Sequence, residues 1–198
     1  MKILFIMMAT LFFISGCSIN ENTNESDERK APYDGQLLNI GVIGEKPSKS
    51  FGNITFHSAE PDSLKQEEYD AYFITEQYFE DLSHEGWKSV FMSINTPVFF
   101  LNIDVQPFIY RTEGMKYEET SPKATEHTSG FVITEDMIKM WGYGNPMDLT
   151  DVNRTPEWIF NSIFRDIEEH LKHENSINQL INNQSLLTLT GDYHNQYI

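Results

Sequence analysis

Short, almost wholly apolar runs alternate with helical segments in the first half of the chain, and this alternation constrains the fold more than any other feature. The runs are QLLNIGVIG (36–44), NITFHS (53–58), DAYFIT (70–75) and PVFFLN (97–102). Their length and their β-branched and aromatic content predict strands. PVFFLN is continuously apolar, which predicts burial on both faces. The order of elements predicts an α/β fold: a single domain with a mixed, mostly parallel sheet covered by helices.

Helices are predicted over 61–69, which Pro61 opens, and over 76–92, with a break near Gly86. Further along, the pattern is less regular. It predicts a strand over 105–112, a loop or exposed hairpin over 113–129, a strand over 130–134, a short helix over 135–141 capped by Thr134, a loop over 142–153, and an edge strand over 186–190.

The clearest helix is predicted over 155–173. Thr155 is a suitable N-cap, Pro156 then takes the first helical position, and Glu157 suits the positive end of the helix dipole. Apolar residues recur at intervals of three and four along this segment and should form one buried stripe: Phe160, Ile163, Phe164, Ile167 and Leu171.

The amino terminus has the order of a secretory signal peptide. One positive charge at Lys2 precedes the apolar run 3–14, and small residues follow it. The run is shorter than the roughly 20 apolar residues that a spanning helix needs. We therefore expect export rather than a permanent transmembrane span.

The four residues Ile14-Ser15-Gly16-Cys17 resemble the lipobox of bacterial lipoproteins, and Cys17 is the only cysteine of the chain. The resemblance covers the first 17 residues. It implies that residues 1–16 are removed and that a diacylglyceryl group is attached to the Cys17 sulfur. It places the protein on the extracytoplasmic face of a bacterial cell membrane. The alternative is an ordinary signal peptide in which Cys17 is incidental.

The segment after Cys17 is polar and charged, so residues 17–34 are predicted to be a flexible tether and residues 35–198 the folded domain. A lipidated Cys17 would leave the mature domain without a thiol, which excludes an internal disulfide and a thiolate metal site.

A strong negative charge limits the possible partners. The chain has 14 Lys and Arg against 30 Asp and Glu, for a net charge of −16, and loss of Lys2 with the signal makes it −17. Nucleic-acid phosphates require a basic surface, so no nucleic acid is expected as a partner. The expected partners are the membrane, through the lipid on Cys17, and an envelope protein or a small-molecule ligand. No cofactor is predicted.

Two groups of residues are candidates for a site. Trp141, Tyr143 and Trp158 lie near flexible glycines and could line a ligand-binding surface, although such aromatics also form the rim of a core. Asp166, His170 and His173 recur at helical spacing and could bind a metal. Histidines near a helix carboxyl end also interact favourably with its dipole without any metal.

Three other patterns give weaker indications of a functional site. The glycines Gly41 and Gly44 follow a strand, but neither a phosphate loop nor a dinucleotide loop is spelled out. Asp148, Asp151 and Asn153 do not have the spacing of an EF-hand loop and fit a turn before the Thr155 cap. Glutamates could act as an acid–base pair only if the fold brings them together: Glu76, Glu80, Glu113 and Glu118.

These observations leave two functions open. The first is binding of a solute, a peptide or an envelope protein. The strand–helix units that end in DAYFIT and PVFFLN are similar to one lobe of solute-binding proteins, a family that usually has two lobes. The second is a cell-envelope hydrolase with an unrecognised active site. Neither a G-x-S-x-G elbow nor an S-x-x-K motif is present in the sequence, which favours binding.

The lipobox makes a direct prediction. Protein purified from the membranes of its host should begin at Cys17, and its amino-terminal peptide should carry the mass of a thioether-linked lipid. Because the sulfur is the point of attachment, Cys17→Ser should abolish lipidation and leave residues 1–16 in place. Mass spectrometry of both proteins decides the matter, and an unmodified Cys17 in the wild type would contradict it.

Overall fold

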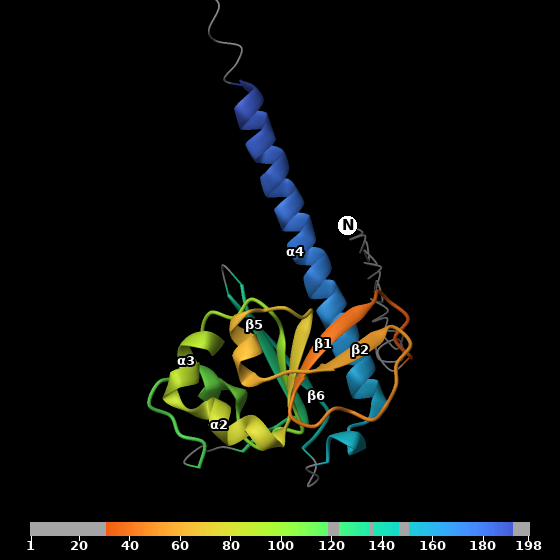
Figure 1. The fold of residues 1–198 in the computed structure, drawn as a ribbon, viewed down its shortest axis with the longest axis vertical. Coiled ribbons are helices and arrows are strands. Elements are labelled where there is room, and N and C mark those ends of the chain that lie inside the picture. The colour runs from red at the N-terminus through yellow and green to blue at the C-terminus, as the bar shows by residue number, and fades with distance from the viewer. Residues whose placement is uncertain (1–30, 119–122, 135–136, 147–150, 192–198) are drawn as a thin grey trace, which may run out of the picture.

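A six-stranded mixed sheet forms the centre of the fold in the computed structural model, which describes residues 31–118, 123–134, 137–146 and 151–191 (Figure 1). Its strand order is β2-β1-β3-β4-β5-β6. The neighbours β2–β1, β1–β3 and β3–β4 are parallel, whereas β4–β5 and β5–β6 are antiparallel. The strands are β1 (Leu38–Ile43), β2 (Ile54–Ser58), β3 (Ala71–Ile74), β4 (Val98–Leu101), β5 (Thr128–Ile133) and β6 (Ile138–Tyr143).

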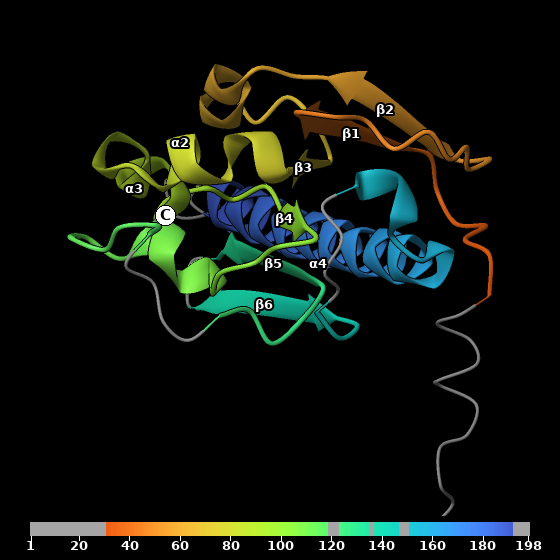
Figure 2. The same cartoon turned by 90° about the horizontal axis from the view of Figure 1, so that it is seen from below.

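Helices cover both faces of the sheet. The long helix α4 packs on one face, and in Figure 2 it lies between the β1–β2 end and the β5–β6 end of the sheet. Short helices pack on the other face. The helical elements are η1 (Pro61–Lys65), η2 (Glu76–Tyr78), α2 (Phe79–Ser83), α3 (Glu85–Phe91), η3 (Pro107–Arg111), η4 (Val152–Arg154) and α4 (Glu157–Gly191).

The two faces follow from the alternation of side chains along each strand. In β3, Phe73 points to the α4 face while Tyr72 and Ile74 point to the other. In β4, Phe99 and Phe100 divide in the same way. All residues of both strands are buried, because helices cover them above and below. The sequence prediction of an α/β fold with a mixed, mostly parallel sheet is confirmed.

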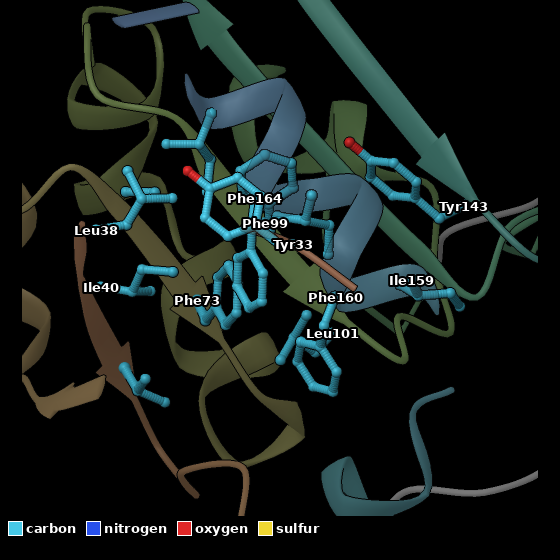
Figure 3. Close-up of a cluster of buried hydrophobic side chains, with 14 of the residues drawn as sticks. Tyr33, Leu38, Ile40, Phe73, Phe99, Leu101, Tyr143, Ile159, Phe160 and Phe164 are labelled. Atoms are coloured by element: carbon cyan, nitrogen blue, oxygen red, sulfur yellow. The ribbon is translucent and has the colours of Figure 1, made fainter. Parts of the chain in front are cut away.

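Aromatic rings fill the space between α4 and the sheet (Figure 3). The Phe164 ring lies 6.4 Å from that of Phe73 and 5.0 Å from that of Phe51, measured between centroids. Phe160 packs beside it, with centroids 6.2 Å apart. The predicted stripe on this helix is thus the main contact between α4 and the sheet. Burial of each such ring contributes about 1.5–3 kcal/mol.

Residues 31–36, which lie at the boundary between the predicted tether and domain, are fastened to α4. The Arg165 guanidinium donates to the carbonyl oxygens of Ala31 and Pro32 at 2.9 and 3.0 Å. Tyr33 is buried against Phe164, and its backbone N–H donates to Asn161 Oδ1 at 3.0 Å. The described fold therefore includes these residues, and a soluble chain should begin at residue 31.

Helix α4 continues well past its predicted end at residue 173. Its first half lies on the sheet, and Figure 1 shows its second half projecting beyond the rest of the fold. The predicted edge strand over 186–190 is wrong, because these residues belong to α4. In the described part of the chain, no helix combines the length and the apolar character needed to cross a membrane.

Two other predictions in the second half of the chain are wrong. The predicted strand over 105–112 is wrong: Pro107–Arg111 form η3, because Pro107 lacks an N–H and suits the first turn of a helix, and only Val105 makes an isolated β-bridge, with Lys123. The helix predicted over 135–141 is instead the start of β6, where residues 135 and 136 lie outside the described residues. Thr134 does not cap a helix; its hydroxyl donates to the Met137 carbonyl at 2.9 Å and tightens the hairpin turn.

The helical segment over 76–92 is broken, as predicted, but at His84 rather than Gly86. His84 has φ −64° and ψ 154°, an extended conformation that separates α2 from α3. The segment 61–69 contains only the short helix η1.

The packing of α4 predicts a large effect for one truncation. Phe164→Ala should lower the free energy of unfolding by about 3–5 kcal/mol, because it opens a cavity among the rings of the cluster. Urea denaturation of a chain beginning at residue 31 measures this. Leu37→Ala is the control: that side chain is 76% exposed, and its loss should cost under about 0.5 kcal/mol. Equal losses for the two variants would refute the assigned role of α4.

Candidate functional site

The predicted aromatic surface is not assembled by the fold. Tyr143 is 6% exposed, and its hydroxyl donates to Asp166 Oδ2 at 2.6 Å. Trp141 is partly buried, with its ring 5.2 Å from that of Phe99. Trp158 lies in the first turn of α4 and is 37% exposed. Two of the three side chains therefore serve the core beneath α4, and none of them lines either of the two hollows described below.

The three predicted metal ligands have different surroundings and do not form a common site. Asp166 accepts the bond from Tyr143, and His170 is buried against the edge of the Trp141 ring, whereas His173 is exposed. Among the side chains that the structure describes, no group of three or more His, Cys, Asp or Glu is arranged to hold a metal ion. The helical spacing of these residues instead reflects the line where α4 meets β6.

The glycine turn after β1 is closed by contacts with residues 153–155, which precede α4. Gly44 has φ +108°, and a Cβ there would lie 2.1 Å from Thr75 Oγ1, so only glycine fits. Beyond the turn, the Lys49 ammonium donates to the Thr155 carbonyl oxygen. Asn153 links the same loop through Glu45 and Ser48. The lysine is thus engaged in the fold rather than presented to a phosphate.

The residues weighed as a calcium site form a turn. Asp151 Oδ1 accepts from the Asn153 backbone N–H at 2.8 Å, which caps η4. Asp148 lies outside the described residues.

A hollow of about 420 Å³ lies between α2, the start of α3 and residues 114–118. Glu80 and Glu118, both considered as acid–base candidates, line it together with Glu85. Glu85 is held by the backbone N–H of Gly114 at 3.3 Å. Glu76 and Glu113 are not among the lining residues. The fold therefore brings together only part of the predicted carboxylate group.

The larger hollow is a groove of about 520 Å³ between the β5–β6 hairpin and α4. The hairpin contributes Ile133, Thr134, Met137 and Lys139, and Asn95 closes one side. Helix α4 contributes Glu169, His170, His173, Glu174, Ile177, Asn178 and Ile181. The groove thus starts where α4 leaves the sheet and continues along the projecting half of the helix.

Apolar side chains stand exposed along this groove. Met137 is 67% exposed, Ile181 53% and Ile177 36%. At the rim, the Lys139 ammonium lies 3.6 Å from a Glu169 carboxylate oxygen, and it also lies over the Trp141 ring. An apolar trough with a few charges at its edge suits an apolar segment of a polypeptide or an amphipathic small molecule.

The imidazole of His170 forms part of the wall of the groove and is uncharged at neutral pH. His170 is 4% exposed, and burial lowers the pKa of its imidazole, against the opposing effect of Glu174. A hydrogen bond with the Asn95 backbone also opposes the shift. Burial likewise lowers the pKa of His127, which lies under the turn after β6.

The sequence interpretation did not find this groove, because it assigned residues 135–141 to a helix. The segment carried no clear strand signal, because Ile138 and Met140 on one side and Trp141 and Tyr143 on the other are all apolar or aromatic, without the alternation of a half-buried strand. Read as a strand, the segment pairs with β5 and places Met137 at the tip of a hairpin beside α4.

Comparison of the chain with protein-family models, with curated proteins and with solved structures finds no match. Its function is therefore argued from the residues and geometry of the chain itself.

The two buried histidines predict acid sensitivity. Their pKa values in the folded state are below the ordinary value, so below about pH 6.5 the unfolded chain binds protons that the folded chain does not. The free energy of unfolding should fall with decreasing pH, by up to about 1.4 kcal/mol per pH unit for each histidine. His170→Gln and His127→Gln should each flatten this slope between pH 6.5 and 5. Denaturation at several pH values tests this, and unchanged slopes in both variants would contradict it.

Proposed function

We propose that this chain is a membrane-anchored extracytoplasmic lipoprotein that binds a partner in the groove between the β5–β6 hairpin and α4. The anchor is the lipid on Cys17, and the partner is an envelope protein, a peptide or a small solute. The observation that carries the binding role is the groove itself, with the exposed apolar side chains of Met137, Ile177 and Ile181 along it.

The site favours recognition over chemistry. Its deepest titratable group, His170, packs against Trp141 and is kept neutral by burial, so it contributes shape and apolar surface. Lys139 and Glu169 at the rim pair with each other across the edge of the groove. Such a polar rim around an apolar floor is typical of binding surfaces.

The position of the described amino end fits an anchor. Residues 31–36 bind α4 at Arg165 and Glu168, near the place where the helix leaves the sheet. A flexible tether of the length of residues 18–30 spans on average about 20 Å. The tether would hold the projecting half of α4, and the groove at its root, close to the membrane.

An envelope hydrolase is the second candidate, and the hollow lined by Glu80, Glu85 and Glu118 is the observation that favours it. Carboxylates that share a hollow can act as acid and base. If this alternative holds, Glu80→Gln should abolish turnover of a cell-wall or peptide substrate, and changes in the groove should leave turnover intact.

Two matched methionine variants test whether the groove is the binding site. A chain beginning at residue 31 is used as bait against solubilised envelope proteins and in thermal-shift screening of small solutes. Met137→Asp should abolish retention or the shift, because it places a charge on the apolar wall. Met92→Asp places the same charge at a 43% exposed methionine that does not line the groove, and it should have no effect.

Binding that survives Met137→Asp would rule out the groove as the site. Equal loss in both methionine variants would show that charge alone, and not the groove, governs the interaction.

A further inference from the structure

The second half of α4 projects without support from the rest of the fold (Figure 1). Leu180 is 64% exposed and Ile181 53%. Asn, Ser and Thr, which are weak helix formers, are frequent after residue 174. Isolated helices of this length are marginal in water, and most helices in proteins are stabilised by packing of an apolar face. Within the described residues, no other element covers the apolar face of this half, and a partner surface would stabilise it.

This half of the helix is also uncharged. From Asn175 to Thr190 the sequence contains no Asp, Glu, Lys, Arg or His, although the whole chain has a net charge of −16. Two copies of such an acidic protein repel each other over most of their surfaces. A helix face without charge is where two copies can approach at the least electrostatic cost.

The three apolar side chains that the structure describes in this half share one face. Ile177, Leu180 and Ile181 are three and four positions apart, which places them along one side of a helix. Residues at such intervals form the seam of two-helix packing.

We propose that the partner of this face is a second copy of the chain, with the two α4 helices paired in parallel about a twofold axis. In a pair of this kind each residue of the seam meets its own counterpart. The parallel direction rests on the membrane anchor of the proposed function. The second copy would be a protein partner that contacts the outer end of the same groove.

The parallel direction follows from the anchor. Residues 31–36 and the exit point of α4 lie at the same end of the sheet. Two copies held by short tethers to one membrane present that end to the same surface, so their projecting helices run in the same direction. An antiparallel pair would turn one copy away from the membrane.

A lipid surface fits this helix less well than a second copy does. Helices that lie on membranes commonly carry Lys and Arg on the polar face, which attract anionic headgroups. The described polar residues of the projecting half are instead uncharged: Asn175, Ser176, Asn178 and Gln179. These side chains suit contact with water and with another protein.

Single cysteines test both the partner and its direction. A chain beginning at residue 31 lacks Cys17, so an introduced cysteine is its only thiol. It contains every residue of both core clusters. Ile177→Cys should form a disulfide-linked dimer under mild oxidation, because the two thiols face each other across the axis. Gln179→Cys lies on the opposite side of the helix and should remain largely monomeric under denaturing, non-reducing electrophoresis.

Equal cross-linking of the two cysteine variants would overturn the proposal. A dimer by mass whose Ile177→Cys variant does not cross-link would overturn the parallel arrangement.

Light scattering of the same soluble chain measures the assembly directly. The wild type should have the mass of a dimer at tens of micromolar, and Leu180→Lys should shift it to a monomer. Gln179→Lys adds the same charge on the opposite face and should leave the dimer intact. Circular dichroism should show less helix in the monomeric variant.

A monomeric wild type at all concentrations would overturn the dimer. That result would leave the groove untouched, since the pair of methionine variants tests the groove separately, and the lipid on Cys17 is tested by mass spectrometry.

Discussion

The packing of α4 on one face of the sheet is the interaction on which the rest of the structure depends. Phe160 and Phe164 reach from the helix into a layer of rings that includes Phe73 (Figure 3). Both rings also contact that of Phe51. The same helix holds residues 31–36 through Arg165 and Asn161. The loop after β1 also reaches this helix, because the Lys49 ammonium lies over the Phe160 ring, 5.7 Å from its centroid. Two segments from the amino-terminal part of the described chain thus pack on the carboxyl-terminal helix.

This arrangement divides α4 into two halves with different tasks. The first half is a structural element whose aromatic stripe is buried under the sheet. The second half contains no aromatic residue, and from Asn175 to Thr190 it contains no charged residue, while Ile177, Leu180 and Ile181 are exposed on one side. The groove lies at the junction, where β6 and α4 diverge. We interpret the helix as the link between a rigid domain and a surface for association.

Local pattern was sufficient to predict the sheet up to β4 and the start of α4. The strands 71–74 and 98–101 are short, continuous apolar runs, and every residue in them is buried. The stripe through Phe164 has the spacing of a helix. The prediction failed at residues 138–143, where Met, Lys and Ile are compatible with helix as well as strand. Pairing with β5 decides the matter, and pairing between distant segments is invisible to local propensity.

The candidate site shows the same limit. Asp166 and His170 have the spacing of metal ligands on a helix, yet the sheet supplies Tyr143 as the partner of one and Trp141 as the neighbour of the other. Their chemistry is set by residues of β6. Tyr143, for example, is 23 residues away from Asp166 in the sequence. The groove could not be predicted either, because it exists only between a hairpin and a helix that the sequence does not place side by side.

Hydrogen exchange along α4 at several protein concentrations tests the division of this helix most directly. Amides of residues 160–171 should exchange slowly at every concentration, because the sheet protects them. Amides of residues 175–190 should exchange quickly in dilute protein and become protected as the concentration rises. Rapid exchange of the second half at all concentrations, or protection that is independent of concentration, would contradict the account.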